Sequence, residues 1–271
     1  MEFSRQEIYN LGNKEIFKSE LIKKGFVVIK NLIDKNLSEN IRSIMSRGDS
    51  SHESLETIFL RNHLNSLEIY NNELYELIKS EPGIHNIEKI LRTLPDSVCL
   101  ARSDAYKSKK SDVPILRWHN DKAFGGDKII HNRVQNKLFS YKLFIHATST
   151  KTNDGCFSYI PNSNRISIFL RKAFRKGIIE YSPFWEISDF SRLLENAEVV
   201  KLRNSYDMTF RKEISDFLET AKKIHNDPNC KDFEIPCNEG DAILFDERGF
   251  HQGGIPKFSD RIVLRLFYLK I

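Results

Sequence analysis

The sequence lacks the features that mark several protein classes. Its four cysteines, Cys99, Cys156, Cys230 and Cys237, do not show the Cys-x-x-Cys spacing of zinc sites. They are also too few for a disulfide framework in a chain of 271 residues. No stretch of about 18 apolar residues occurs, and the N-terminus has no basic start followed by an apolar core. We therefore expect a cytoplasmic protein with free thiols and no membrane segment.

An excess of one charge is also missing. The formal net charge is only +5 at pH 7 and is spread along the chain, so nucleic acid is not an expected partner. The short basic runs KSKK (107–110) and RKAFRK (171–176) are typical of solvated faces. No internal repeat or low-complexity tract is visible. The length suits a single domain with a substantial core, spanning residues 1–271.

The hydrophobic patterns predict helices first and strands afterwards. KGFVVIKNLI (24–33) predicts a strand that leads into a helix, and residues 54–79 and 84–94 predict two further helices. From about Ser97 short β-like runs take over, namely SVCLARSDAY, KLFSYKLFIHAT, GCFSYIP, GDAILFD and RIVLRLFYL. Helices followed by strands predict an α+β fold, mainly β, with an antiparallel sheet system.

A segment of different character interrupts the strands at about residues 175–232. YSPFWEISDF is aromatic and irregular, whereas TFRKEISDFLETAKKIH carries apolar residues on one helical face. Such an insertion can be a lid over a site or a decoration outside the sheets, and the sequence favours neither. If it is a lid, we expect Phe184, Trp185 and Tyr206 to shape the substrate site.

The stretch WHND (118–121) raises the question of a metal site. On an extended strand, residues two apart point to the same face, so His119 and Asp121 would converge. Alone, such a triplet is more often a solvated turn or a surface hydrogen bond. His251, which follows GDAILFDERGF, is the candidate third ligand. Two imidazoles and one carboxylate on one face suit non-haem Fe(II) and leave positions open for a co-substrate and dioxygen.

The remaining histidines rank lower as ligands. His146 shares a strand face with Lys142 and Phe144, and it either faces the pocket or is an interior histidine with satisfied hydrogen bonds. The second interpretation is the favoured one. The other histidines fall in helical or loop stretches and are expected to be surface or hydrogen-bonded residues: His52, His63, His85, His131 and His225.

Two arginines lie on the predicted final strand. Arg261 follows His251 by ten positions, and a buried guanidinium needs a carboxylate partner, which a dicarboxylate co-substrate would supply. Arg265 shares the same strand face but lies about 13 Å further along, at roughly 3.3 Å per residue. We therefore expect Arg261 to be the anchor. Arg265 is expected to pair with a neighbouring acidic side chain or to help bind an anionic substrate.

These motifs together resemble the phytanoyl-CoA hydroxylase-like family of iron- and 2-oxoglutarate-dependent dioxygenases. The resemblance runs from about residue 24 to the C-terminus, and its elements occur in the family order: GFVVIKNLI, WHND, NDGCFSYIPNSNR, GDAILFDERGFHQGG and RIVLRLFY. It implies a double-stranded β-helix, a cupin-like jelly roll, with N-terminal helices packed on it and a helical insertion.

The resemblance also implies roles for individual residues. His119, Asp121 and His251 would hold Fe(II) as the catalytic centre, and Arg261 would bind the distal carboxylate of 2-oxoglutarate. Lys142 and Phe144 are further expected contacts of the co-substrate. The implied reaction consumes dioxygen and 2-oxoglutarate, releases succinate and CO2, and hydroxylates an unactivated C–H bond of a small molecule. The identity of that molecule and the oligomeric state stay open.

The sequence departs from the family pattern at several positions. The family often has Gly-Ser after the distal histidine, with the serine helping to hold the carboxylate, whereas Gln252, Gly253 and Gly254 follow here. A hydroxyl must therefore come from elsewhere or be absent. Phe144 occupies a position where the family often has tryptophan, and Asn162 occupies one where the family has a small residue. The presence of Asp121 argues against a halogenase.

Two alternatives to this function remain. One is a metal-binding protein of the same fold without 2-oxoglutarate turnover, against which Arg261 is the main feature. The other is a non-enzymatic binding module, which would make the three candidate ligands accidental.

Overall fold

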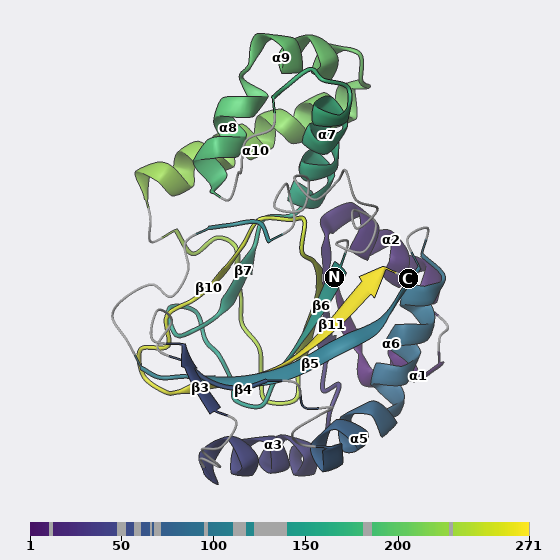
Figure 1. Cartoon of the computed structure of the whole chain (residues 1–271), viewed down its shortest axis with the longest axis vertical. Helices are drawn as coiled ribbons and strands as arrows, with labels where there is room; N and C mark the ends of the chain where they lie inside the picture. The colour runs from purple at the N-terminus through teal and green to yellow at the C-terminus, as the bar shows by residue number, and fades with distance from the viewer. Residues whose placement is uncertain are drawn as a thin grey trace.

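The computed structural model places two β-sheets at the centre of the molecule, with helices around them (Figure 1). It describes residues 1–10, 13–47, 53–56, 61–65, 67, 72–94, 97–110, 118–121, 140–180, 186–227 and 230–270. Within these residues, every helix is too short or too polar to cross a membrane.

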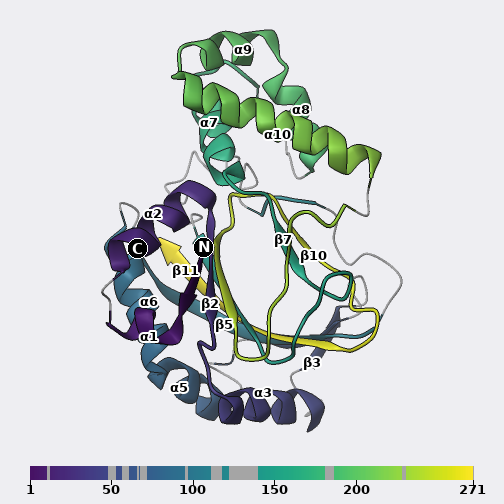
Figure 2. The same ribbon diagram turned by 180° about the vertical axis from the view of Figure 1, so that it is seen from behind.

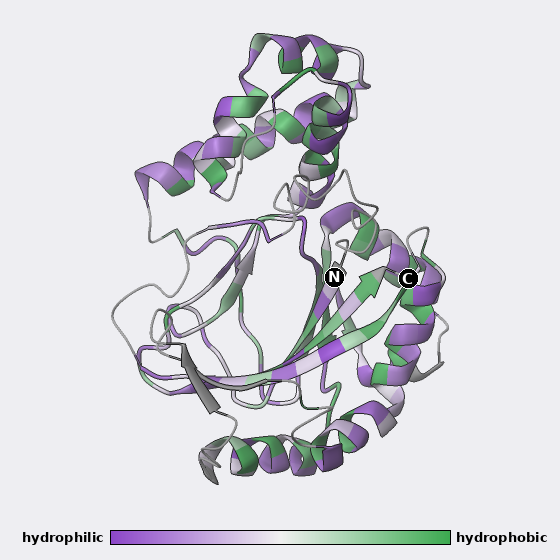
Figure 3. Ribbon diagram, in the orientation of Figure 1, coloured by the Kyte–Doolittle hydropathy of each residue, from purple (hydrophilic) through white to green (hydrophobic). Residues whose placement is uncertain are grey.

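The larger sheet is mainly antiparallel, with only β1 and β2 running parallel among the described strands. Its strand order is β1-β2-β9-β6-β11-β5-β4-β3. In that order the strands span Glu2–Ser4, Phe26–Lys30, Ala242–Asp246, Ser140–His146, Arg261–Lys270, Val98–Ser108, Arg61–Asn65 and Glu53–Glu56. Both polar and apolar residues occur along the long strands β5 and β11 (Figure 3).

The smaller sheet is formed by β10 (His251–Gly253), β7 (Phe157–Tyr159) and β8 (Glu234–Ile235), in that order. It lies across from the larger sheet in both views of the ribbon (Figures 1 and 2). Between the sheets lies an inner cluster of buried residues: Tyr106, Phe144, Phe157, Tyr159, Cys237, Ile243, Phe245 and Val263. The predicted α+β fold with an antiparallel sheet system is thus confirmed.

Helices of the N-terminal part cover the outer face of the larger sheet (Figure 1). They are α1 (Arg5–Asn10), α2 (Lys14–Lys24), α3 (Lys35–Arg47), α5 (Asn72–Ser80) and α6 (Pro82–Arg92). In α6, Pro82 occupies the first turn and Ile84, Ile87, Ile90 and Leu91 are buried. They join one large core with Leu264 and Leu266 of β11 and Leu143 and Ile145 of β6. Each fully buried side chain of this kind contributes roughly 1.5–3 kcal/mol to stability.

One predicted helix is wrong in its first half. Residues 53–56 and 61–65 form strands β3 and β4, which pair with each other, and β4 pairs with β5. Helix α5, Asn72–Ser80, matches the second half of the predicted helix 54–79. The free edge of β5 offers hydrogen bonds to a neighbouring strand, and this long-range pairing outweighs a local periodicity.

A separate helical unit lies beyond one end of the two sheets (Figures 1 and 2). It consists of α7 (Ser163–Arg175), α8 (Ile187–Leu194), α9 (Ala197–Asn204) and α10 (Met208–Asn226). Asp207 caps α10 by accepting a hydrogen bond from the Phe210 amide at 2.9 Å. The unit has its own hydrophobic core, which includes Phe169, Phe190, Ile214 and Phe217. Its first helix follows β7 directly, so the unit begins before the expected start at about residue 175.

Candidate metal centre

The structure brings His119, Asp121 and His251 together. One ligand atom from each residue lies within 4.8 Å of those of the other two. His251 begins β10, and its backbone forms two hydrogen bonds with that of His119, of 3.0 and 3.1 Å. The Nε2 atoms of His119 and His251 lie 3.4 and 3.2 Å from the Asp121 carboxylate. His119 forms isolated β-bridges with Glu186 and with His251 rather than part of the strand assumed from the sequence, yet the side chains converge.

The tautomer of His251 is set by its own loop. Its Nδ1 lies 3.0 Å from the carbonyl oxygen of Gly249, so Nδ1–H donates there and Nε2 is left with a free lone pair. The side chain is only 5% exposed. Burial, and then the charge of His119, lower the pKa of His251. The ring is therefore neutral near neutral pH, which is the form that binds a metal.

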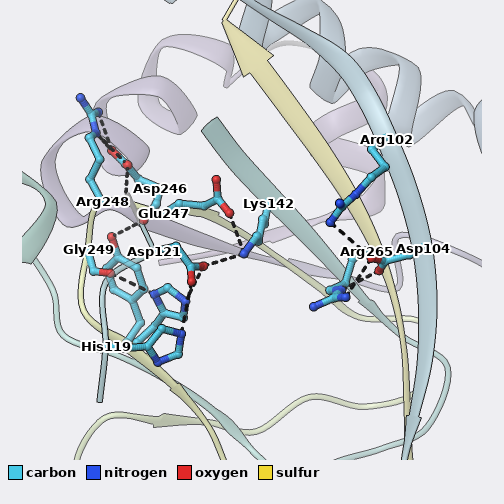
Figure 4. A network of polar contacts seen from close by, with 12 residues as sticks. Arg102, Asp104, His119, Asp121, Lys142, Asp246, Glu247, Arg248, Gly249 and Arg265 are labelled. Carbon is cyan, nitrogen blue, oxygen red and sulfur yellow. Dashed lines mark hydrogen bonds and ion pairs between the residues drawn. The ribbon is translucent and has the colours of Figure 1, made fainter. Parts of the chain in front are cut away.

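Lys142 connects Asp121 to a second carboxylate (Figure 4). Its Nζ lies 2.5 Å from Asp121 and 2.6 Å from Glu247. Burial would raise the pKa of Asp121, but the charges of Lys142 and His251 outweigh it and hold this pKa well below its usual value. Burial likewise opposes the charge of Lys142, but Asp121 and Glu247 outweigh it and raise the pKa of Lys142. Asp121 is thus ionised, and Glu247 offers Lys142 another partner when Asp121 binds a cation.

Glu247 was missed in the sequence. Its side chain is 2% exposed although a lone carboxylate is rarely buried without a partner. The available signal was its place in GDAILFDERGFH, where a buried strand is followed at once by acidic residues and the candidate ligand His251. Its partner Lys142 lies 105 positions earlier in the chain, too far away for a local pattern to connect them.

The helical unit holds the two histidine segments in place. Trp118 and Phe250, which directly precede the two histidines, are buried in the core of that unit. The Phe250 amide donates to Ser163 Oγ at 2.8 Å. Asn120, which is buried, donates to Ser167 Oγ of α7 at 3.0 Å and also to the Arg248 carbonyl. Neighbouring side chains in an extended segment point to opposite sides. His119 and His251 therefore point away from that core and towards Asp121.

The two arginines of β11 have different partners. Arg265 lies opposite Asp104 on β5 and binds it through two hydrogen bonds, of 2.6 and 2.8 Å. This is the first of the two roles expected for it. Arg261 is 3% exposed and donates through Nη1 to the Gly155 carbonyl at 2.5 Å. Its Nε and Nη2 have no hydrogen-bond partner among the described residues. A buried guanidinium with free donors fits a carboxylate ligand.

Several other predicted residues can be placed. Phe144 lies inside the inner cluster, with its ring centroid 5.3 Å from that of Phe157 and 4.9 Å from that of Phe245. Tyr206 packs on Phe169 and Phe210 within the helical unit rather than beside the three ligands. His85 and His225 are exposed on α6 and α10, as expected. Four predicted side chains lie outside the described part of the chain: His52, His131, Phe184 and Trp185. His63 lies on β4, but its side chain is not described.

A cavity of about 430 Å³ opens beside Asp121. Phe267 and Leu269 of β11 and Ala101 of β5 give it an apolar part, and it has four charged lining residues: Arg102, Asp121, Lys142 and Glu247. The Arg102 guanidinium lies 4.2 Å from the centre of the Phe267 ring, and Lys142 Nζ lies 5.3 Å from the same centre. The cavity thus offers a ligand both charges and an apolar surface next to the candidate metal ligands.

Comparison with known proteins links this fold to a group of solved enzymes. No family model and no curated protein sequence matches the chain. Among solved structures, the non-heme alpha ketoglutarate dependent carbocyclase SnoK from nogalamycin biosynthesis has a TM-score of 0.60 at 16% identity, covering 97% of this chain and 85% of that one. The epimerase SnoN, in complex with Fe3+, alpha ketoglutarate and nogalamycin RO, has a TM-score of 0.59 at 11% identity, with 96% and 84% covered.

HygX from Streptomyces hygroscopicus, with nickel and 2-oxoglutarate bound, has a TM-score of 0.58 at 13% identity, with 94% of this chain and 86% of that chain covered. The chain shares the fold of these enzymes. Identities this low carry the architecture and not the individual reaction. The resemblance to the phytanoyl-CoA hydroxylase-like family rests on the sequence motifs and stays a prediction.

Proposed function

We propose that this protein is a non-haem Fe(II)- and 2-oxoglutarate-dependent oxygenase of the phytanoyl-CoA hydroxylase-like type, which hydroxylates a C–H bond of a small molecule. The observation that carries the proposal is the convergence of His119, Asp121 and His251, whose ligand atoms lie within 4.8 Å of one another. Two imidazoles and a carboxylate suit Fe(II) and leave the opposite face of an octahedron open. The solved structures with the same fold, two of which hold a metal and the co-substrate, add support.

The residues present fit the metal. His119 and His251 present Nε2 and Asp121 presents an ionised carboxylate, which is a donor set that suits Fe(II). When bound there, Fe(II) would supply the activation of dioxygen, coupled to conversion of 2-oxoglutarate to succinate and CO2. The Gly249 carbonyl fixes the tautomer of His251, and Lys142 keeps Asp121 ionised. The cores around Trp118 and Phe250 exclude water from behind the two histidines.

The residues also fit the co-substrate. Arg261 is buried on the inner face of β11, and two of its guanidinium nitrogens have no hydrogen-bond partner within the part of the chain that the structure describes. A carboxylate accepts two parallel hydrogen bonds from such a group. We therefore assign Arg261 to the distal carboxylate of 2-oxoglutarate. Phe144 and its neighbours in the inner cluster would line the apolar chain between that carboxylate and the metal.

The cavity beside Asp121 is the natural place for the substrate. Its lining by Arg102, Lys142 and Glu247 favours a polar or charged small molecule over a purely apolar one. SnoN has been solved in complex with nogalamycin RO and HygX with hygromycin B, which supports a small molecule as the substrate.

The test is anaerobic addition of 2-oxoglutarate to the Fe(II)-loaded protein, followed through the weak visible charge-transfer band of the chelate. We expect the band in the wild type. We also expect much weaker Fe(II) binding, and succinate release at background, in His119→Ala, Asp121→Ala and His251→Ala, with far-UV circular dichroism unchanged. His85→Ala, which changes an exposed histidine on α6, is the matched control.

Fe(II) binding without the band would instead support a metal-binding protein that does not use 2-oxoglutarate. Full activity in one variant would remove that residue from the site.

A further inference from the structure

His146 is a buried histidine whose ring forms no hydrogen bond with the described part of the chain. It is the last residue of β6 and is 1% exposed. Its backbone is satisfied, because its amide donates to the Asp241 carbonyl at 2.9 Å and its carbonyl accepts from the Gly240 amide at 2.8 Å. Neither ring nitrogen has a partner among the described residues. A neutral imidazole carries one donor and one acceptor, and buried polar groups nearly always have partners. The described residues therefore offer no support for His146 as an interior histidine with satisfied hydrogen bonds.

Arg261, near His146 across the sheet, also has buried nitrogens without a hydrogen-bond partner among the described residues. His146 lies opposite Val263 of β11 in the register. Arg261 precedes Val263 by two residues and so occupies the diagonal position on the same face of the sheet. The charge of Arg261 adds to burial in lowering the pKa of His146, to about 3. A neutral imidazole and a guanidinium, both with free polar atoms, thus border one spot on the inner side of the larger sheet.

This spot lies on the same face of β6 as Lys142, but at the opposite end of the strand. Lys142, Phe144 and His146 alternate along β6, and Lys142 contacts Asp121 at its end of the row. Phe144 stands between the two ends, within the inner cluster. Gly253, two residues after His251 and on the same side of β10, offers no side-chain donor to this region. Among the described residues, His146 and the buried Ser108, which lies opposite Arg261 on β5, have side-chain donors without partners in this region.

We propose that His146 is a co-substrate-binding residue, which donates a ring N–H to the distal carboxylate of 2-oxoglutarate beside Arg261. The inference rests on the proposed function, because it assumes that Arg261 anchors this carboxylate. It explains why two unsatisfied groups are buried side by side: a single carboxylate accepts hydrogen bonds from both. It also supplies the donor that the loss of a hydroxyl at position 253 would otherwise remove.

The test compares two ligands that differ only in the distal group. 2-Oxoglutarate and 2-oxopentanoate chelate a metal alike, but 2-oxopentanoate lacks the distal carboxylate. Both are titrated into the anaerobic Fe(II) protein, with the charge-transfer band as readout. In His146→Leu we expect the Kd of 2-oxoglutarate to rise about tenfold to a hundredfold, as for loss of a hydrogen bond to a charged group. The Kd of 2-oxopentanoate should change less than about twofold. His146→Gln, which keeps an N–H donor, should recover part of the loss.

The control is Tyr268→Phe, because Tyr268 is also buried on β11 with an unpartnered hydroxyl but belongs to the core on the other face of the sheet. It should bind both ligands as the wild type does. An unchanged Kd of 2-oxoglutarate in His146→Leu, or an equal loss for the two ligands, would overturn the inference while leaving the proposed function intact. A wild type that binds no 2-oxoglutarate would overturn both.

A second measurement avoids substitution altogether. In the Zn(II)-loaded wild type, which is diamagnetic, the ring nitrogens of His146 can be followed by 15N NMR after histidine-selective labelling. We expect 2-oxoglutarate to shift these resonances and 2-oxopentanoate to leave them in place. Resonances that respond equally to the two ligands would contradict a contact with the distal carboxylate.

Discussion

At the residue scale, the centre is organised by paired charges. One ammonium, Lys142, lies between the carboxylates of Asp121 and Glu247, and one guanidinium, Arg265, is bound in a fork by Asp104. Pairs of this kind can stay ionised in a buried place because each charge has a partner within hydrogen-bond distance. Arg261 differs from them because its described partner is a single backbone carbonyl. Because its guanidinium is not paired with a carboxylate of the described residues, we expect Arg261 to bind an anionic ligand.

This difference leads to a prediction for the two arginines. Arg261→Lys should weaken 2-oxoglutarate binding by about tenfold or more, because an ammonium cannot reproduce the two hydrogen bonds of the planar guanidinium. Arg265→Lys should leave the affinity within about twofold, since Arg265 is already bound to Asp104. The measurement is the anaerobic titration of each Fe(II)-loaded variant, and the arginines serve as each other's control. A larger loss in the Arg265 variant would overturn the assignment.

At the element scale, the strands and helices with strong local patterns were predictable. GDAILFD and RIVLRLFYL correspond to β9 and β11, and the stripe at 84–94 corresponds to α6. The failure at 53–65 has a physical reason, because β3 and β4 exist through pairing at the edge of β5. The three candidate ligands were predictable because the order of their motifs along the chain resembles that of a known family, although His251 lies 132 positions from His119. The roles of Glu247 and Asp104 were not predictable, because no motif connects them to partners more than 100 positions away.

The helical unit is the element whose dynamics matter most for the site. Its core includes Trp118 and Phe250, the residues next to two candidate ligands, and Glu186 at the start of α8 forms a β-bridge with His119. We predict faster amide hydrogen exchange in α8 and α9 than in β9 when no ligand is bound, because lids come from the less stable parts of a fold. Exchange measured by mass spectrometry tests this. Helix α6, which packs on the larger sheet, is the control for helices as such. Exchange in α8 and α9 as slow as in β9 would speak against a lid.

At the scale of the whole molecule, the site depends on segments that are distant in the sequence. His119 and His251 are separated by 132 positions, and the helical unit occupies much of the chain between them. The two sheets bring them together, and the same arrangement buries His146 and Arg261 side by side on the inner face. Folding therefore places an imidazole where protonation is unfavourable, and this has a consequence for global stability.

That consequence is a specific loss of stability in acid. The pKa of His146 is lowered from 6.5 to about 3 by burial and then by the charge of Arg261. Between these values the unfolded chain binds a proton that the folded protein does not, so the free energy of unfolding falls as the pH falls below 6.5. The slope from this group is about 1.4 kcal/mol per pH unit, which gives roughly 2 kcal/mol between pH 6.5 and pH 5. Well above pH 6.5 it contributes no slope. Urea unfolding of the wild type and of His146→Leu at pH 7.5, 6.5, 5.5 and 5.0 measures the effect.

Because the other groups titrate in both proteins, the wild type should lose about 2 kcal/mol more than the variant over the acid range. His85→Leu, at an exposed site, should follow the wild type. Parallel stability curves for the wild type and His146→Leu would show that His146 is protonated in the folded protein, and would contradict its burial as a neutral ring beside Arg261.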